Sequence, residues 1–304
     1  MGNPHRTGAG RPLALVTGAS SGIGLALAGE LADHGHDLVL AAEDDTLHEA
    51  ADRIRRHSAP SPARTHSRAH PRSHLHAPSR PPSPGHPHVL AVQADLATQA
   101  GVEAVYDAVY ETVLVRDAPV AVAVLNAGIG HAGAFLESEP ADHARVIDLN
   151  LSSTVYLARL LLPGMVERGE GRMLITSSAV ADLPGPFHAV HNASQAFLKS
   201  FALGLGRELE GTGVTVTTLL PGLTDSRFFV RAGLLDTRLG RSRKTDPAVV
   251  ARQARAALLA DRPRAVAGPR GARAKAMAVG LLPERVRVGI HRWWAEPGGG
   301  QRGL

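Results

Sequence analysis

The chain has 304 residues, of which 44% are hydrophobic and 20% charged, a composition typical of a globular protein with room for one large α/β domain. It contains no cysteine, which excludes disulfides, thiolate metal sites and cysteine nucleophiles. The first apolar run, Leu13 to Val16, is too short for a signal peptide, and no stretch approaches the roughly 20 apolar residues of a membrane span. We therefore expect a cytoplasmic protein.

The formal net charge of +5 is unevenly distributed along the chain. Residues 53–94 hold seven arginines and no acidic residue, and residues 262–292 hold eight lysines and arginines against one glutamate. The rest of the chain is therefore acidic. This pattern indicates an acidic folded body with two basic attachments, and it does not by itself indicate nucleic-acid binding.

The N-terminal part alternates short apolar strands with amphipathic helices. Residues 13–17 and 37–42 are apolar runs of strand length, and Gly35 offers a helix stop between them. After each run, apolar residues recur at helical spacing: Ile23, Leu27 and Leu31 in the first helix, and Leu47, Ala51 and Ile54 in the second. The sequence therefore predicts a βαβα arrangement from the start.

Residues 57–88 interrupt this alternation. They contain eight prolines, seven histidines and six serines, with almost no large apolar side chain. Such a segment buries too little apolar surface to offset the entropy of ordering it, which predicts a disordered insert. Its histidines could bind Zn²⁺, Ni²⁺ or Cu²⁺, but their irregular spacing favours a flexible linker, and we predict no metal site.

The alternation then resumes and continues to Pro221. The predicted strands are 89–94, 119–125, 171–177 and 213–220, and the predicted helices are 98–115, 138–168 and 188–210. Short apolar strands separated by amphipathic helices predict an α/β fold with a single doubly wound parallel sheet and helices on both faces.

Beyond Pro221 the pattern is weaker, with a helix predicted from Asp246 to Ala260 and a strand at 264–268. Residues 270–294 then mix arginines with apolar residues and predict a basic helical segment. Docking of this segment on the protein's own core or on a second subunit is favoured over contact with a membrane surface. The predicted organisation is a flexible N-terminus (1–10), one domain (11–268) interrupted by the insert, and a basic amphipathic tail (269–304).

The strongest local motif is a glycine-rich turn between the first strand and the first helix, with the sequence Thr17-Gly18-Ala19-Ser20-Ser21-Gly22-Ile23-Gly24. Glycines at such a place allow a tight turn, close approach of the backbone to a pyrophosphate, and close packing of helix on strand. The phosphate charge meets the N-terminus of the helix. The motif predicts dinucleotide binding, with a purely structural turn as the alternative.

This turn resembles the TGxxxGxG fingerprint of the short-chain dehydrogenase/reductase family, and the likeness extends from about residue 11 to residue 230, outside the insert. The resemblance implies a Rossmann-type fold and hydride transfer between a nicotinamide cofactor and a carbonyl or alcohol substrate. It also implies that Asp95 and Leu96 hold the adenine ring, and that the family's NAG motif corresponds to Asn126, Ala127 and Gly128. Both segments follow strands, where an open parallel sheet binds ligands.

Further positions match the family's site residues. Asn150 matches a helix-kinking asparagine of the proton relay, the alternative being a polar residue on an exposed face. Ser178 matches the serine that hydrogen-bonds the substrate oxygen as negative charge develops there. Pro221, Gly222 and Thr224 match the segment over the nicotinamide, although a simple strand-ending turn would explain the first two residues as well.

The tyrosine and lysine of the family's YxxxK motif are replaced in this sequence. Ser178 stands thirteen residues before the position of the catalytic tyrosine, which is His191, and the lysine position is Gln195. In the family the lysine binds the ribose and lowers the pKa of the phenol. An imidazole, with a pKa near 6.5, needs no such cation, and Gln195 could still bind ribose hydroxyls. Lys199, two turns beyond His191, is interpreted as a solvated surface lysine.

Two hypotheses for function remain open at this point. In the first, His191 is the general acid/base of an NAD(P)-dependent oxidoreductase, with Ser178, Gln195 and Asn150 as its other site residues. In the second, the chain is a catalytically silent dinucleotide-binding scaffold or regulatory pseudoenzyme, because both family groups are replaced.

The choice of cofactor is weakly marked. Relatives that prefer NADP place arginine in the glycine-rich turn or after the second strand, where this chain has Ser20, Ser21 and Glu43. Glu43 and Asp44 would repel a 2′-phosphate and could accept from a ribose hydroxyl, which favours NAD without excluding NADP. Alternatively, the two carboxylates only begin the next helix near its positive end.

The expected partners are a small, apolar carbonyl or alcohol substrate and a second copy of the chain. The family often pairs through the long helices, here near 140–165 and 190–210, so the resemblance implies a homo-oligomer. The basic segments are accompanied by no interleaved aromatic platform and no groove-reading helix, so we expect no nucleic-acid partner.

Overall fold

A computed structural model describes residues 11–57, 86–269, 271 and 282–298 of the chain. The predicted flexible N-terminus and nearly all of the predicted insert lie outside the described residues, as do the first part and the last residues of the predicted tail. The helix before the insert continues to His57, which was assigned to the insert from composition.

Seven parallel strands form one sheet, in the order β3-β2-β1-β4-β5-β6-β7. The order of winding reverses between β1 and β4, which places the topological switch point of a doubly wound sheet in the centre of the molecule. The predicted fold class is therefore confirmed. The strands are β1 (Leu13–Thr17), β2 (Asp37–Ala42), β3 (Val89–Gln93), β4 (Val120–Leu125), β5 (Gly171–Thr176), β6 (Val214–Pro221) and β7 (Arg264–Ala267).

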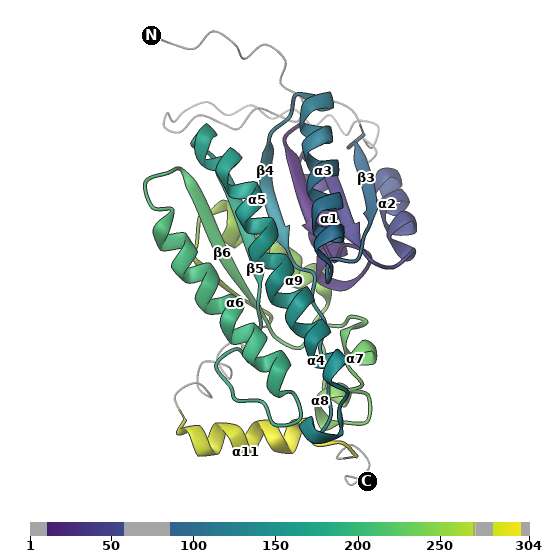
Figure 1. Ribbon diagram of the computed structural model, residues 1–304, viewed down its shortest axis with the longest axis vertical. Helices are drawn as coiled ribbons and strands as arrows, with labels where there is room; N and C mark the ends of the chain where they lie inside the picture. The colour runs from purple at the N-terminus through teal and green to yellow at the C-terminus, as the bar shows by residue number, and fades with distance from the viewer. Residues whose placement is uncertain (1–10, 58–85, 270, 272–281, 299–304) are drawn as a thin grey trace, which may run out of the picture.

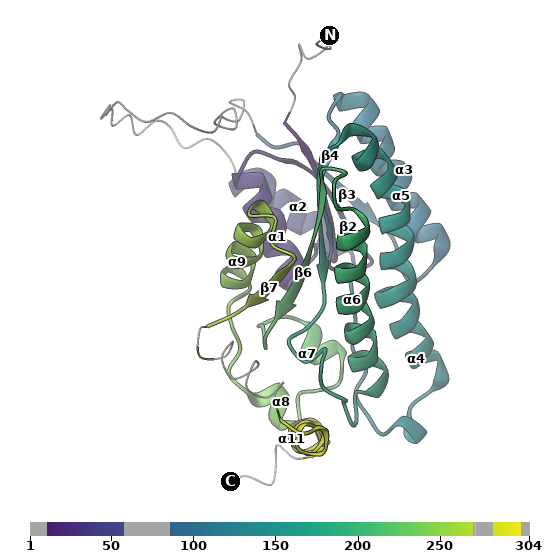
Figure 2. The same ribbon diagram turned by 90° about the vertical axis from the view of Figure 1, so that its left-hand side faces the viewer.

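Helices cover both faces of the sheet: α1, α2 and α9 lie on one face, and α3, α5 and α6 lie on the other (Figures 1 and 2). Their bounds are α1 (Gly22–Asp33), α2 (Thr46–His57), α3 (Gln99–Arg116), α4 (Pro140–Ile147), α5 (Ser153–Arg168), α6 (Ala189–Glu208), α7 (Phe228–Arg231), α8 (Arg238–Arg241), α9 (Pro247–Leu259) and α11 (Glu284–Ala295). A 3₁₀ turn at Phe135–Glu137 precedes α4.

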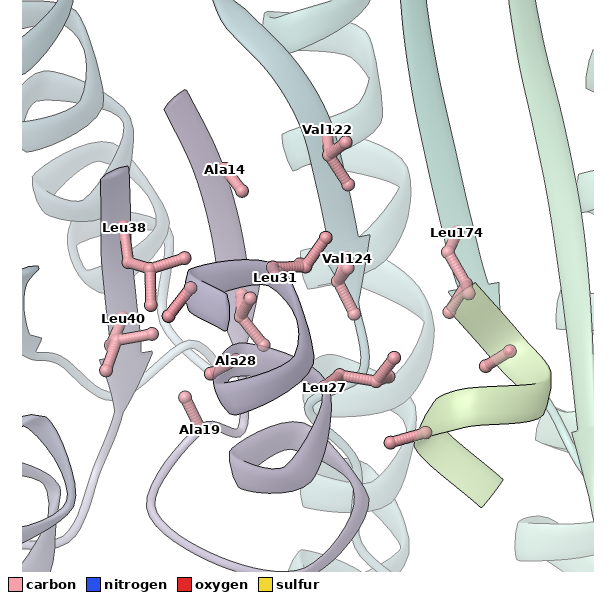
Figure 3. Packing of buried hydrophobic residues seen from close by; sticks show 14 of the residues in the cluster. Ala14, Ala19, Leu27, Ala28, Leu31, Leu38, Leu40, Val122, Val124 and Leu174 are labelled. Atoms are coloured by element: carbon pink, nitrogen blue, oxygen red, sulfur yellow. The ribbon is translucent and has the colours of Figure 1, made fainter. Parts of the chain in front are cut away.

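The core consists of two apolar layers, one on each side of the sheet. Every residue of β1 and β2 is buried, as expected for central strands that are covered on both faces. In the layer shown in Figure 3, Leu27 and Leu31 of α1 point toward the sheet near Ala14 and Val124. The four-residue spacing seen in the sequence is therefore the buried stripe of α1.

The long helix predicted at 138–168 is interrupted. A π-helical turn at Asp148–Ser152 separates α4 from α5. π-helical turns widen one turn of a helix and are frequent at functional sites. This one lies beside the carboxyl ends of the central strands, because α4 begins after the loop that follows β4.

The helices α7, α8 and α11 lie at the carboxyl ends of the strands and close one end of the molecule (Figure 1). The pattern beyond Pro221 did not predict α7 or α8, which are only one turn long. The Arg238 guanidinium of α8 lies 4.5 Å from the ring centroid of Trp293 in α11, and it donates a hydrogen bond to the Trp293 carbonyl (2.9 Å). Docking of the tail on the protein's own body is therefore confirmed for α11.

None of the helices in the described ranges is both long enough and apolar enough to cross a membrane.

Candidate active site

The glycine-rich turn joins the end of β1 to the start of α1 and depends on the absence of side chains. Gly18 and Gly22 have φ values of +65° and +57°, which residues with a Cβ rarely adopt. A Cβ at Gly24 would lie 2.2 Å from the Gly18 carbonyl oxygen. Steric constraints therefore account for all three glycines of the motif.

The Thr17 side chain ties the end of β1 to the end of β4. Its hydroxyl accepts hydrogen bonds from the backbone N–H groups of Asn126 (2.9 Å) and Ala127 (3.0 Å). The Asn126 amide in turn donates to the Thr17 carbonyl (3.2 Å) and accepts from the Thr176 hydroxyl at the end of β5 (3.1 Å). The structure thus brings the predicted residues Thr17 and Asn126 together as one rigid unit across three strands.

The N-terminus of α1 fits an anionic group such as a pyrophosphate. The N-cap residue Ser21 makes no side-chain capping bond, and the first turn of α1 holds no acidic residue. The free N–H groups and the positive end of the helix dipole are therefore not compensated by the chain in the described residues. Ser226, in the segment after β6, lies against Gly22, where a Cβ would come 2.9 Å from the Ser226 Cβ.

Two predicted acidic residues flank an arginine that the sequence did not single out. Arg145 of α4 pairs with Glu43 (2.8 Å) and with Asp95 (3.1 Å). Burial acts to raise the pKa of Asp95, but hydrogen bonds from Arg145 and from the Ala97 backbone lower it overall. Leu96 is buried beside this pair. The charge pattern alone could not reveal Arg145, because 50 residues separate it from Asp95.

Asp44, rather than Glu43, contacts the glycine-rich turn. Its carboxylate accepts from the Ser20 hydroxyl (2.8 Å) and pairs with Arg231 of α7 (2.8 Å), while Arg227 lies 3.8 Å away. Burial acts to raise the pKa of Asp44, whereas hydrogen bonds from Thr46, Ser20 and Arg231 lower it overall. The segment after β6 is therefore held by charge over the glycine-rich turn.

A small pocket of about 120 Å³ lies beside the two arginines Arg145 and Arg231. Its walls come from the loop after β4, from α4 and from α7, namely Ile129, Gly130, His131, Asp142, Arg145, Val146 and Arg231. A larger surface depression of about 260 Å³, lined by Gly29, Asp33, Arg53, Ile54 and His57, involves none of the candidate site residues.

Asn150 lies in the π-helical turn and is fully buried. Its Oδ1 accepts from the Ile129 N–H (2.9 Å), and its Nδ2 donates to the Ile129 carbonyl (3.0 Å) and to the Ser194 hydroxyl of α6 (2.9 Å). The alternative that Asn150 is a polar residue on an exposed face is wrong. The side chain joins the loop after β4 to α6, beside Gly128, where a Cβ would come 3.2 Å from Asn150 Oδ1.

His191 lies in the first turn of α6 with 8% of its surface exposed. Its Nδ1 is 3.1 Å from the Ile129 carbonyl, so Nδ1 donates the hydrogen bond and Nε2 carries the lone pair of the neutral ring. Burial lowers the pKa of His191 to about 4, against the opposing effect of the Ile129 hydrogen bond. The ring is therefore neutral near pH 7, which corrects the assumption of an imidazole that titrates near 6.5.

Neither the Ser178 nor the Gln195 side chain is hydrogen-bonded to His191 in the described chain. The Ser178 hydroxyl accepts from the Val180 N–H (3.3 Å), and no hydrogen bond within the described residues connects it to His191. The neighbouring Ser177 is the serine that reaches α6, where it donates to the Gln195 carbonyl (2.7 Å). The Gln195 side chain is buried and makes no hydrogen bond in the described part of the chain.

The structure also shows the surroundings of Lys199 and Thr224. Lys199 is paired with Asp182 and its side chain is only 16% exposed, so the interpretation as a solvated surface lysine is wrong. Thr224 is buried and donates to the Gly222 carbonyl (2.9 Å), and the Gly222 N–H donates to Ala267 of β7 (3.1 Å). The Pro221–Thr224 segment therefore continues from the sheet toward the glycine-rich turn.

The fold and the site together define a Rossmann-type α/β protein whose glycine-rich turn lies at the carboxyl end of its first strand. A family model described as short chain dehydrogenase matches residues 12–66 and 78–233. The chain belongs to this family of oxidoreductases.

Individual proteins show the same relationship. Sulfoacetaldehyde reductase 2 of Chromohalobacter salexigens is 29% identical over 234 residues, covering 73% of this chain and 76% of that protein. An NADP-dependent 3-hydroxy acid dehydrogenase of Salmonella typhi is 26% identical over 223 residues, covering 71% and 74%. A solved short-chain dehydrogenase from Sphingobium yanoikuyae in complex with NADPH is 28% identical, with a TM-score of 0.69 over 84% of this chain and 87% of that chain.

Proposed function

We propose that the protein is an NAD(P)-dependent oxidoreductase that transfers hydride between the nicotinamide and a carbonyl or alcohol carbon of a small substrate. The observation that carries the proposal is the glycine-rich turn, whose three glycines are sterically required and which opens onto an uncapped helix N-terminus. The relatives include proteins described with NADP or in complex with NADPH.

Four residues would form the chemical site. Ser178 would hydrogen-bond the substrate oxygen, and His191 would exchange its proton. Gln195, one turn after His191 on α6, would bind the ribose through a side-chain amide that has no partner in the described chain. Asn150 positions His191, because both side chains bind the Ile129 peptide group.

The protonation state of His191 favours one direction of the reaction. With the Nδ1–H group directed at the Ile129 carbonyl, Nε2 of the neutral ring can accept a proton from a substrate hydroxyl. A nicotinamide cofactor held at the glycine-rich turn would supply the hydride acceptor, so that the carbon carrying this hydroxyl would become a carbonyl carbon. Because burial holds the pKa of His191 at about 4, the imidazolium needed for carbonyl reduction is scarce near pH 7. We therefore expect the ring to act as the proton acceptor in alcohol oxidation near pH 7.

NAD remains the favoured cofactor in this proposal. Glu43 and Asp44 follow β2, where a 2′-phosphate would bring further negative charge. Each carboxylate already has an arginine partner, Arg145 or Arg231, so the expected preference for NAD is small.

The first test is a calorimetric titration of the full chain with NAD⁺, NADH, NADP⁺ and NADPH. Micromolar binding of one pair would support the proposal and identify the cofactor. If none of the four binds, the glycine-rich turn is only structural in this protein and the oxidoreductase proposal fails.

The second test addresses His191. We expect His191→Ala to abolish turnover while leaving dinucleotide affinity nearly unchanged. His48→Ala, at an exposed position of α2, is the matched control and should retain full activity. Activity that persists in His191→Ala would remove this residue from the mechanism.

A silent dinucleotide-binding scaffold is the second candidate function. The deep burial of His191 and the lack of a side-chain link between Ser178 and His191 in the described chain favour it. The discriminating variant is the double substitution His191→Tyr with Gln195→Lys. Activity that appears only in this variant would support the scaffold, whereas an active natural protein that the substitutions impair would exclude it.

We also propose that the protein is a homo-oligomer that pairs through α5 and α6. Both helices present apolar side chains to the surface, including Val155, Val166 and Phe197. Light scattering after size-exclusion chromatography should give a multiple of the 31.8 kDa chain mass. Phe197→Glu should reduce that mass to the monomer value if this face forms the contact.

A further inference from the structure

The C-terminal helix α11 is the outermost element at one end of the molecule. Figures 1 and 2 show it at this end, beyond α6 and α8. His291 and Ala295, which are four residues apart on the helix, are buried against the body. Arg287 donates a hydrogen bond to the Asp182 carbonyl in the loop after β5 (2.7 Å). The contacts with the body therefore use one side of α11, and the opposite side is open within the described residues.

The open side carries two neighbouring rows of side chains. Val286 and Trp293 are seven residues apart, which is about two helical turns, and they are 46% and 55% exposed. Arg285 and Arg292 repeat this spacing one residue earlier, and both are exposed. Leu282, just before the helix, is exposed as well. Val286, Trp293, Arg285 and Arg292 form the outer face of α11, with an apolar row beside a basic row.

Positive charge predominates around this face. The helix α11 contains three arginines and one glutamate, and α8 adds Arg238 and Arg241 without an acidic residue. With the flanking Asp236 and Glu296 included, five arginines stand against three carboxylates. The chain outside its two basic segments is acidic. The electrostatic field of the protein therefore directs this end toward a negatively charged surface.

Trp293 combines apolar surface with an adjacent cation. Its ring centroid lies 4.5 Å from the Arg238 guanidinium, and the rest of the ring is open to the outside. Tryptophan is enriched where lipid headgroups meet acyl chains, because its ring contacts apolar groups while its N–H stays hydrated. An exposed tryptophan beside arginines is therefore suited to the surface of a bilayer.

The size and the charge of the outer face favour a lipid surface over a protein partner. Twelve residues at 1.5 Å each give α11 a length of about 18 Å. With a width of about 10 Å, the face offers about 200 Å², well below the about 800 Å² that a stable protein interface takes from each partner. A second copy of the chain would also bring like charges together. A lipid surface has no such limit, and each arginine near anionic headgroups strengthens binding about fivefold.

We propose that the outer face of α11 binds an anionic phospholipid surface. Val286 and Trp293 reach into the headgroup region, and Arg285 and Arg292 pair with the lipid phosphates. Docking of α11 on the body and contact with lipid are compatible, because they use opposite sides of the helix. The contact is peripheral, and it requires neither dinucleotide binding nor turnover.

The test uses the full chain and two kinds of vesicle, phosphatidylcholine alone and phosphatidylcholine mixed with phosphatidylglycerol. Sedimentation of the vesicles should show at least about tenfold tighter binding to the anionic mixture. The two tryptophans of the chain, Trp293 and Trp294, both lie in α11, so their emission should shift to shorter wavelength on binding. Absence of binding, equal binding to the two kinds of vesicle, or binding without a shift would overturn the proposal.

Charge reversal locates the contact on the helix. Arg285→Glu combined with Arg292→Glu should weaken binding to the anionic vesicles at least about tenfold. The matched control is Arg53→Glu combined with Arg56→Glu, which makes the same change of net charge at exposed positions of α2 and should leave binding nearly unchanged. Equal losses in the two variants would reveal a response to net charge alone and would refute the assignment to α11.

A second variant and a mass measurement cover the remaining outcomes. Tryptophan emission without vesicles reports whether α11 stays docked in each variant. If the charge reversal undocks the helix, Val286→Asp at an exposed position tests the apolar row, and it should weaken binding and abolish the emission shift. An unchanged shift in this variant would refute the apolar contact. If light scattering shows that charge reversal instead lowers the mass of an oligomer, the face joins copies of the chain and the lipid proposal fails.

Discussion

The two ends of the candidate site differ in how their polar groups are satisfied. At the glycine-rich turn, Thr17, Asn126 and Ser20 all have hydrogen-bond partners within the chain. At the junction of α6 and α11, His188 Nε2, Asn192 Oδ1 and Arg287 Nε are buried without partners in the described residues. The first end is complete without a ligand except for the open N-terminus of α1, whereas the second carries unsatisfied groups in its interior.

This difference separates positions that the fold requires from positions that the fold tolerates. The threonine and asparagine at the end of β1 and β4 stabilise the sheet whether or not a dinucleotide binds, because their bonds lie between strands. Buried groups without partners lower stability and are retained when function requires them. Perturbing one end of the site at a time tests this comparison.

The largest expected effect is acid destabilisation at the α6 end. Burial lowers the pKa of His188 to about 3 and of His191 to about 4, while in the unfolded chain both would titrate near 6.5. The unfolded state therefore takes up protons first, and stability is lost as the pH falls from 6.5 toward 4. By linkage the two histidines together should cost on the order of 5 kcal/mol at pH 4.

Denaturant unfolding measured at several pH values between 7.5 and 4.5 checks this prediction. His188→Asn should reduce the pH dependence by about half, if the two shifted histidines contribute similarly. His48→Asn, at an exposed position of α2, should leave the dependence unchanged. Equal slopes in all three proteins would show that the buried imidazoles do not control acid stability. His131 and His291 also act on the pKa of His188, and both remain in every variant.

At the glycine-rich end the largest effect is steric. Gly24→Ala places a Cβ 2.2 Å from the Gly18 carbonyl oxygen and 2.7 Å from Asn126 Nδ2, so the turn must move. We expect a loss of about 3 kcal/mol in the free energy of unfolding and a loss of dinucleotide binding. Gly29→Ala, also in α1 but with no atom within 4 Å of the new Cβ, should instead stabilise the protein by about 0.5 kcal/mol. Chemical denaturation of both variants checks the contrast.

The same contrast explains what the sequence could predict. The sheet, the glycine-rich turn and the order of the helices follow from apolar periodicity and glycine spacing, which are local properties of the chain. Thr17 was predicted from the glycine-rich motif and Asn126 from the family resemblance, and both stand at the ends of parallel strands, which lie at one edge of the sheet.

The residues that sequence reasoning missed depend on contacts between distant segments. His291 meets Asn192 across 99 residues of chain, and Arg231 meets Asp44 across 187. No periodicity relates such positions, and α7 and α8 are too short to produce a pattern. The pKa of His191 was misjudged for the same reason, because burial is a tertiary property that the identity of the residue does not reveal.

Asn150 links the two ends, and its removal should have an intermediate effect. Asn150→Ala leaves the Ile129 N–H without its partner and removes one of the two hydrogen bonds made by the Ile129 carbonyl and by the Ser194 hydroxyl. We expect a loss of about 2 kcal/mol in unfolding free energy, because the orphaned N–H keeps its desolvation cost and two further hydrogen bonds are lost. Since Ile129 also holds His191, any turnover should fall further than dinucleotide affinity does. A variant with unchanged stability would contradict the hydrogen-bond network.

The smallest expected effect concerns the charge contacts over the glycine-rich turn. Asp44→Asn removes the ion pairs with Arg231 and Arg227, which are partly exposed, so the expected loss of stability is only about 1 kcal/mol. Because the folded-state pKa of Asp44 is lowered, its contribution is present near neutral pH and is lost in the natural protein as the pH falls through that pKa. Asp45→Asn, which changes an exposed neighbour, is the control.

The rate of dinucleotide association shows whether the Asp44–Arg231 contact also limits entry of the cofactor. If the Arg231 pair holds the segment after β6 over the turn, Asp44→Asn should speed association, and an unchanged rate would show that the segment does not limit entry.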